Sequence, residues 1–382
     1  MKVWQELLGQ PEAIEQLSRI VENKDSGFQH SWLFTGPAGS GRSTLARAFA
    51  AALQCSSNGC GECPSCKLVL ADAHPDVRML VTDKVIISIE EVRQLVQFAA
   101  LGASLGSYRI VIIEDADRMS ERTSNVLLKA LEEPQEKTVW ILCAPSAADM
   151  LPTIRSRTRN VVLRLPSVEE VAQLLAQRDG VKEELALASA RQAQQHVGMA
   201  RRLALSSEAR SRRMETLREL VGIKDLSSAM ATAERLLALA KKDAESSSEE
   251  KNLQERAKLL AAYGIEDEKI PANLRSEFRQ LEENQKRRNT RALRDGIDRI
   301  LTDTESLFRD ILSLQLGAAA PLINQELTQE IQNRAAQTSA DNSIAVLEAI
   351  SLSRSRLESN VRDLLVLESL CTKLIVRGFV AA

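Results

Sequence analysis

The residues whose spacing most clearly points to chemistry form a glycine-rich loop, Gly36-Pro37-Ala38-Gly39-Ser40-Gly41-Arg42-Ser43-Thr44. An apolar segment, 31–35, precedes the loop, and an alanine-rich segment, 45–53, follows it. A strand, a glycine loop and a helix in this order form a phosphate-binding loop, because glycine lets backbone N–H groups turn toward a polyphosphate. A glycine-rich turn without a ligand is the alternative. The candidate nucleotide contacts in the loop are Gly36, Gly39, Gly41, Arg42, Ser43 and Thr44.

Arg42 stands where this loop motif ordinarily has lysine. Arginine keeps the positive charge, but its planar guanidinium is bulkier than an ammonium and cannot lie between the β- and γ-phosphates in the same way. The sequence therefore predicts the shape of the loop. It leaves open whether the loop binds ATP and Mg²⁺, and whether it hydrolyses ATP.

Two carboxylates, Glu114 and Asp115, directly follow the apolar segment 109–113. In nucleotide hydrolases, one carboxylate at the end of a buried strand holds Mg²⁺ and the next polarises water. The usual order is aspartate and then glutamate. Here the order is reversed, so the shorter Asp115 reaches less far toward an attacking water. A solvated acidic strand end without a ligand is the alternative.

Two arginines are candidates for contact with phosphate from outside the loop. Arg157 precedes a predicted strand on a segment that we expect to project, and an arginine held on a rigid turn can stabilise phosphoryl-transfer charge on a neighbouring protein. Arg201, in the run Gly198-x-x-Arg201 at the start of a predicted helix, could reach phosphate across a domain cleft. The alternatives are an ordinary surface arginine and an ordinary helix-start arginine.

Four of the six cysteines lie close together in the sequence: Cys55, Cys60, Cys63 and Cys66. Zn²⁺ takes four tetrahedral thiolates, and short spacings that contain glycine and proline let a chain wrap around the ion. A site closed by four cysteines predicts a structural zinc and not a catalytic one; free or redox-active thiols are the alternative. We expect Cys143 and Cys371 to be inert core residues.

The alternation of apolar runs and amphipathic segments predicts an α/β domain with a parallel sheet over about residues 1–166. After Pro166 no strand pattern follows, and three short helices at 167–205 are expected to form a small lid. Residues 206–382 are predicted to be a helical oligomerisation domain, or collar. Inside it, the charged segment 241–289 predicts an exposed helical hairpin or a mobile insertion, with a solvated face as the simpler interpretation. The apolar periodicity returns from Ile297 to Phe379.

Composition limits the classes of function. With 382 residues and 44% apolar content, the chain is expected to hold two or three packed domains. A net charge of −2 gives no global basic field toward nucleic acid, and 3% aromatic residues argue against extensive base stacking. No stretch approaches 18 consecutive apolar residues and the N-terminus lacks a signal-peptide pattern, so we expect no membrane span and a cytoplasmic protein.

Together these features resemble the clamp-loader AAA+ proteins of bacterial replication, whose domain is a RecA-like α/β fold. Two runs are highly specific, Asn-Val-Leu-Leu-Lys-Ala-Leu-Glu-Glu-Pro at 125–134 and Leu-Pro-Thr-Ile-Arg-Ser-Arg at 151–157. The resemblance is also carried by Leu8-Gly9-Gln10, the loop, the four-cysteine insert and the run 113–119. It covers about residues 1–205; beyond them the chain matches only as an all-helical region.

The resemblance implies a place in a pentamer that uses ATP to open a ring-shaped sliding clamp and close it on primer–template DNA. The implied partners are the gamma/tau and delta subunits, with the clamp and DNA reached through the complex. Gamma/tau subunits hydrolyse ATP. Another type of subunit is a rigid stator without its own ATPase, and it offers the arginine of a Ser-Arg-Cys motif to the nucleotide on the adjacent subunit. The corresponding residues here are Ser156-Arg157-Thr158.

Three departures distinguish this chain from an active ATPase subunit: Arg42, the order Glu114-Asp115, and Pro145-Ser146 where a threonine pair usually senses the γ-phosphate. All three weaken the site within the chain, whereas Arg157 is intact, so the stator is favoured. The alternatives are a gamma/tau-like ATPase that tolerates Arg42 and an unrelated phosphate-loop protein. The run 125–134 argues against the last.

Overall fold

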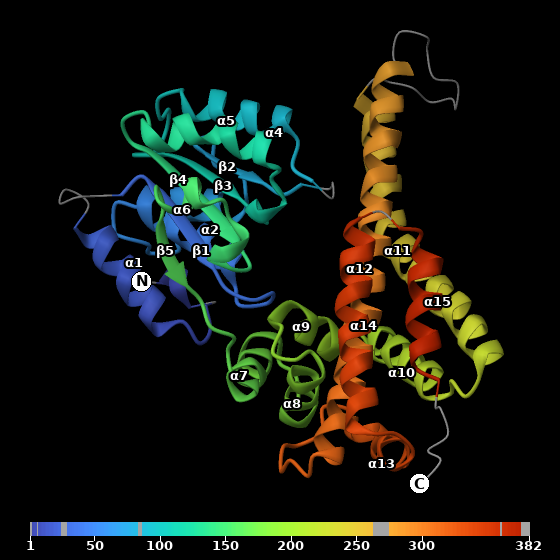
Figure 1. Ribbon diagram of the computed structural model, residues 1–382. Coiled ribbons are helices and arrows are strands. Elements are labelled where there is room, and N and C mark those ends of the chain that lie inside the picture. The colour runs from blue at the N-terminus through green and yellow to red at the C-terminus, as the bar shows by residue number, and fades with distance from the viewer. Residues whose placement is uncertain are drawn as a thin grey trace. The chain divides into compact units, whose positions relative to one another are not determined.

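The structure is a computed structural model that describes residues 2–5, 7–23, 29–82, 86–262, 275–359 and 361–375. The chain divides into two compact units, Met1–Leu205 and Ser206–Ala382, shown together in Figure 1. The finer division of the first unit near residue 166 stays a prediction.

A five-stranded sheet forms the centre of the first unit, with the order β2-β3-β4-β1-β5 (Figure 1). All neighbouring strands are parallel, which confirms the predicted α/β class. The strands are β1 (Ser31–Thr35), β2 (Val77–Leu80), β3 (Arg109–Ile113), β4 (Thr138–Ala144) and β5 (Arg159–Val162). The sequence predicts a buried strand at 77–81, which is wrong, because β2 lies at the edge of the sheet and is only partly buried. The sequence also predicts a last strand at 160–165, but β5 ends earlier, at Val162.

Nine α-helices accompany the described part of the first unit: α1 (Pro11–Glu22), α2 (Arg42–Gln54), α3 (Pro64–Leu70), α4 (Ile89–Ala99), α5 (Glu121–Glu132), α6 (Pro152–Arg155), α7 (Val168–Asp179), α8 (Glu183–Gln192) and α9 (Val197–Leu205). The patterns Ser88-x-x-Glu91 and Ser167-x-x-Glu170 predict capping boxes, and both boxes form. Ser88 starts α4 with Glu91, and Ser167 starts α7 with Glu170. Each box satisfies two backbone N–H groups that a helix start leaves unpaired, and so fixes where the helix begins.

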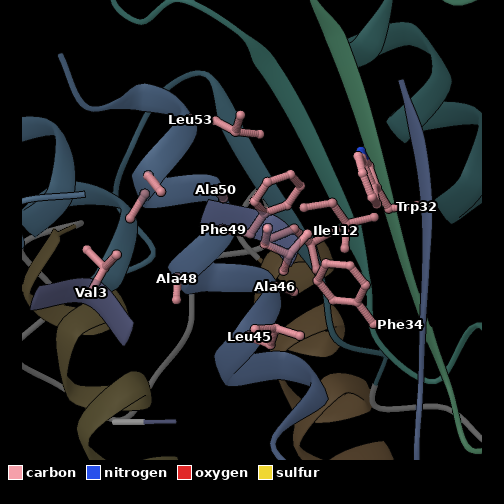
Figure 2. Packing of buried hydrophobic residues seen from close by; sticks show 14 of the residues in the cluster. Val3, Trp32, Phe34, Leu45, Ala46, Ala48, Phe49, Ala50, Leu53 and Ile112 are labelled. Carbon is pink, nitrogen blue, oxygen red and sulfur yellow. The ribbon is translucent and has the colours of Figure 1, made fainter. Parts of the chain in front are cut away.

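Helix α2 is held in the centre of the unit by a small aromatic cluster, seen in Figure 2. The ring centroid of Phe49 lies 5.3 Å from that of Trp32 in an edge-to-face arrangement and 6.1 Å from that of Phe34. All three side chains are fully buried. The alanines of α2 let it approach the sheet closely, and Ala46 and Ala50 have no exposed surface. Since α2 begins at the glycine loop, this packing fixes the loop against the end of β1.

The carboxylate of Asp76, just before β2, holds the backbone of residues 104–106, which leads into β3. This buried carboxylate accepts N–H groups of Ser104, Leu105 and Gly106, each at 2.7 Å, and the Ser104 hydroxyl at 2.8 Å. The Arg109 guanidinium donates to the same carboxylate at 2.9 Å. The start of β3, and through it the position of the carboxylates after β3, therefore depends on one buried acid.

The second unit is helical in every part that the structure describes: α10 (Ser207–Val221), α11 (Leu226–Ala262), α12 (Arg275–Gln315), α13 (Thr328–Gln337), α14 (Ala340–Glu358) and α15 (Asp363–Lys373). Helices α11 and α12 run side by side (Figure 1). The described portions of 241–289 are thus helical, while 263–274 and Phe379 lie outside the described residues. Among the described helices, none has the length and apolar character needed to cross a membrane.

Candidate functional site

The glycine loop joins β1 to α2 in the geometry of an anion-binding turn. Gly39 and Gly41 have φ values of +84° and +91°, which lie in the left-handed region that favours glycine. Gly41 is the N-cap of α2, and no side chain caps this helix start. The N–H groups of the first helical turn, at Arg42, Ser43 and Thr44, can therefore be offered to an anion.

Gln10 fixes the loop to the end of β5. Its side-chain amide donates to the backbone carbonyls of Ser40, at 3.1 Å, and Arg164, at 2.6 Å. Its carbonyl oxygen accepts the Arg164 N–H at 3.1 Å. The Gln10 side chain is buried, so these bonds have little competition from water. Gln10 is one of the residues that carry the sequence resemblance. In the structure its side chain cross-links the glycine loop to the sheet.

Arg42 folds back over the loop toward the carboxylates after β3. Its guanidinium lies 3.9 Å from Oδ1 of Asp115, and its side chain is 13% exposed. Its Nη1 is buried and has no hydrogen-bond partner in the described part of the chain. Arg118 approaches the other oxygen of Asp115 at 3.4 Å. Asp115 therefore lies between two guanidiniums.

Glu114 also faces an arginine, since the Arg47 guanidinium of α2 lies 3.8 Å from its Oε1. The oxygens present here, two carboxylates and the Ser43 hydroxyl, are of the kind that Mg²⁺ binds. The surrounding guanidiniums, however, already supply positive charge at that place and would repel a divalent cation. In charge the site therefore fits Mg²⁺ poorly, although its donor types are suitable.

His196, between α8 and α9, is the residue that packs on the loop from the 167–205 segment. A Cβ at Gly39 would lie 2.7 Å from the Cα and Cγ atoms of His196. The Met199 N–H donates to His196 Nδ1 at 3.2 Å, which leaves the ring proton on Nε2. Burial lowers the pKa of His196, and the nearby Arg42 charge acts in the same direction. Sequence reasoning missed this contact; the only signal was a histidine two residues before Gly198.

Arg201, predicted to reach phosphate, instead donates from Nε to Oδ1 of Asp179 at 3.0 Å. Asp179 also pairs with Arg178. Both arginines lower the pKa of Asp179, Arg178 contributing more. In this conformation the Arg201 charge is used within the 167–205 segment, and the structure does not bring it together with the loop residues. Its phosphate role stays a prediction.

The four cysteines of the insert converge, with all Sγ atoms within 4.8 Å of one another. Cys55 Sγ lies 3.6 Å from that of Cys60 and 3.7 Å from that of Cys63. A tetrahedral Zn²⁺ with Zn–S bonds of about 2.3 Å would need sulfur–sulfur separations of about 3.8 Å. The donor set and its spacing therefore fit zinc, which these four thiolates would hold as a closed structural site.

Backbone amides favour the thiolate at Cys55, whereas burial raises the pKa of the Cys66 thiol. The N–H groups of Ser57, Cys63 and Cys66 donate to cysteine sulfurs at 3.3 to 3.4 Å. Burial alone would raise the pKa of Cys55, but amide donors outweigh it and lower the pKa to about 6. Outside the cluster, burial raises the pKa of Cys143 and Cys371 to about 12, as expected of inert core thiols.

The insert also holds the start of the chain. A Cβ at Gly59, whose φ is +101°, would lie 2.6 Å from a methyl group of Val3. Lys2 forms an ion pair with Glu62. The insert therefore holds the short helix Lys2–Trp4 against α2.

Purified protein that has not been exposed to chelator is expected to contain about one equivalent of zinc. Cys60→Ser should lower this to a small fraction, because one of four ligands is lost and apparent zinc affinity depends on all of them. The matched control is Cys143→Ala, which removes a buried thiol outside the cluster and should leave the zinc content unchanged. Metal analysis by mass spectrometry decides the matter; less than about half an equivalent in the unmodified protein would contradict the site.

Arg157 lies just after α6 and just before β5. Its guanidinium forms an ion pair with Glu132, the last residue of α5, and donates to the Thr153 carbonyl at 2.8 Å. One third of its side chain is exposed. The strand register pairs Arg159 with Trp32, so Arg157, two residues before β5, lies at the end of the sheet where β1 and β5 begin.

The glycine loop follows the opposite end of β1. β1 is five residues long and a strand rises about 3.3 Å per residue, so Arg157 and the loop are separated by at least about 15 Å along the sheet. An arginine side chain is far too short to span this distance. Arg157 therefore cannot reach a nucleotide in the loop of its own chain.

Comparisons with known proteins point to subunits of DNA polymerase III. Residues 9–167 match the family described as "DNA polymerase III, delta subunit". The DNA polymerase III subunit delta' of Pseudomonas aeruginosa is 38% identical over 153 residues, which cover 38% of this chain and 47% of that protein. The delta' subunit of Haemophilus influenzae is 33% identical over 172 residues, covering 44% and 52%.

The matched region thus spans about half the length of these two relatives. The delta' subunit of Bacillus subtilis is 26% identical over 355 residues, and there the similarity covers 92% of both chains. The family match is thus confined to residues 9–167, whereas the similarity to the Bacillus subtilis protein, at lower identity, extends over most of the chain.

Proposed function

We propose that this chain, whose residues 9–167 match the family described as "DNA polymerase III, delta subunit", is the delta-prime subunit of a bacterial clamp loader. In this role it is a stator that supports ATP-driven loading of the sliding clamp onto primed DNA and lends Arg157 to a neighbouring ATPase subunit. The observation that carries the proposal is the position of Arg157, partly exposed at the end of the sheet opposite to the loop of its own chain.

The state of the chain's own loop supports the same role. A hydrolytic site needs Mg²⁺ to bridge the β- and γ-phosphates and neutralise developing charge. Here Glu114 and Asp115 face Arg47, Arg42 and Arg118. His196 in addition occupies the space against Gly39. The chain therefore keeps the shape of the site while giving up the features needed for hydrolysis.

The partners proposed are the gamma/tau and delta subunits, with clamp and primer–template DNA engaged through the complex. Residues 167–205 serve as the lid, and the helical second unit, 206–382, serves as the collar through which subunits associate. The zinc insert has a structural role, because four thiolates leave no open coordination position.

A gamma/tau-like ATPase is the second candidate function. It is favoured by the intact Gly36, Gly39, Gly41 and Ser43 and by the uncapped start of α2. It requires that Arg42 substitutes for lysine in contact with the phosphates, which its present approach to Asp115 does not favour.

The proposal is tested by reconstitution. Gamma/tau, delta, clamp and primed DNA are combined with and without this chain, and clamp loading is followed by fluorescence. We expect loading to require the chain and to be retained when Ser43→Ala is introduced into it. Equal loading in the absence of the chain would contradict the proposed role.

The isolated chain is expected to hydrolyse ATP far more slowly than about 1 s⁻¹, the low end of efficient phosphoryl-transfer enzymes. Arg42→Lys should not by itself create a fast ATPase, because the reversed carboxylates and His196 remain. Steady-state phosphate release measures both proteins. Turnover near about 1 s⁻¹ by the unmodified chain would instead establish the gamma/tau-like alternative.

A further inference from the structure

The ion pair between Arg157 and Glu132 joins two parts of the chain that the proposed function treats separately. Arg157 follows α6, whereas Glu132 is the last residue of α5. The Arg157 guanidinium also donates from Nη1 to the Thr153 carbonyl and, at 3.1 Å, to the Ser156 hydroxyl. These acceptors, on α5, on α6 and on the turn after α6, already engage the guanidinium.

A guanidinium bound in this way is not yet available to another protein. To bridge to the phosphates of a neighbouring nucleotide, Arg157 must give up its carboxylate partner, because both compete for the same planar donors. The exchange is feasible since neither side chain is deeply buried: about one third of Arg157 and nearly half of Glu132 are exposed. Such a pair is weak in water and can be displaced by a more highly charged anion.

We propose that Glu132 is a positioning residue that holds Arg157 against its own subunit until the phosphates of the neighbouring nucleotide displace the carboxylate. The inference rests on the proposed function, since it concerns the arginine assigned to act on the neighbour. It predicts that breaking the ion pair between Arg157 and Glu132 costs part of the binding free energy between the two subunits. Removing the charge of Glu132 therefore strengthens assembly without improving the chemistry.

Helix α5 gives this arrangement a place in the fold. Its start follows closely on Glu114 and Asp115 at the end of β3, and it then runs back to the other edge of the sheet, where Glu132 meets Arg157. Helix α5 thus connects two sites: Glu114 and Asp115 lie shortly before its start, and Glu132, which pairs with Arg157, is its last residue.

The test measures binding of this chain to the gamma/tau subunit loaded with a non-hydrolysable ATP analogue. Glu132→Gln keeps the size of the side chain and removes its charge. Exposed ion pairs of this kind correspond to about a 2- to 5-fold change in an equilibrium, so the dissociation constant is expected to fall by that factor. ATP turnover of the complex at saturating subunit concentration should stay unchanged.

Glu133→Gln is the matched control. Glu133 is the next residue, is exposed, and forms no ion pair with Arg157 in the described structure. It should bind like the unmodified chain. Glu132→Gln introduced together with Arg157→Ala should bind like Arg157→Ala alone, because the carboxylate then has no arginine to hold. A merely structural role of Glu132 would affect binding in both backgrounds.

The outcomes separate this inference from the proposed function. If Arg157→Ala leaves turnover at the adjacent site unchanged, the proposed function fails. If Arg157→Ala lowers turnover but Glu132→Gln binds like Glu133→Gln, the function stands and the inference is overturned. A lower saturating turnover with Glu132→Gln also overturns it, because Glu132 would then support the arginine in its active position.

Discussion

Replacing Arg157 with alanine is expected to lower ATP turnover at the one adjacent gamma/tau site about 10³-fold. An arginine supplied by a neighbour stabilises the charge that develops on the γ-phosphate, and alanine leaves this charge without a partner. The total ATPase of the reconstituted complex should fall only in part, because the other sites receive their arginines from other subunits. Clamp loading should slow, whereas zinc content and assembly should be retained. Single-turnover phosphate release and a fluorescent loading assay measure the two effects.

Arg155→Ala is the natural control. It removes an exposed arginine two residues away, at the end of α6, and should leave turnover unchanged. Arg159 is less suitable, since its guanidinium packs over the Trp32 ring at 5.4 Å and its loss would disturb β5. If complexes with Arg157→Ala load clamps at the unmodified rate, the arginine acts on no neighbouring nucleotide and the chain is a scaffold alone.

The second large effect concerns Asp76. Asp76→Ala is expected to lower the free energy of unfolding of the first unit by about 3 to 5 kcal/mol, because it leaves the buried Arg109 guanidinium and several amides without their acceptor. Thermal unfolding followed by circular dichroism measures the loss. As a control, Asp72→Ala removes a half-exposed acid nearby that pairs with Arg47, and it should cost less than about 1 kcal/mol.

The same residue predicts an acid dependence. Burial alone would raise the pKa of Asp76, but the amides of Gly106, Ser104 and Leu105 outweigh it and lower the pKa to about 2, from 3.8 in the absence of the fold. A lowered pKa stabilises the folded state above pH 3.8, and this contribution of about 2 kcal/mol is lost as the pH falls from 3.8 to 2. Asp76→Asn should lack this part of the pH dependence. Parallel acid-unfolding curves for the two proteins would contradict the assignment.

Much of the sheet could be predicted because its central strands are buried on both faces. β1 and β3 read as continuous apolar runs, and their predicted bounds agree with the structure. β2 lies at the edge of the sheet, where burial on both faces is not required, so its apolar residues do not imply a buried strand. α2 begins at Arg42, three residues before the predicted start, because the helix is capped by the backbone of Gly41 and not by a side chain that the sequence would reveal.

How well each candidate site could be predicted depends on how far apart its residues lie in the sequence. The thiolate cluster lies within a short segment, so its spacing alone predicted that the sulfurs could meet. The contacts of Gln10 with Arg164, of His196 with Gly39 and of Glu132 with Arg157 join distant segments and follow only from the tertiary fold. The catalytic and binding roles assigned to Arg157, Arg201 and the loop stay predictions that the experiments above address.

The glycine loop and Arg157 lie at opposite ends of the strands of one sheet, so the two ends of the subunit differ. If, as proposed, Arg157 is given to a neighbour, each contact joins two different surfaces; such contacts are heterologous and need not close into a symmetric ring. In this chain His196 packs against Gly39 and Arg42 approaches Asp115, so on the proposed function the loop has no use for an incoming arginine. A chain that on this proposal gives an arginine without receiving one is suited to the terminal position of an open, directional row.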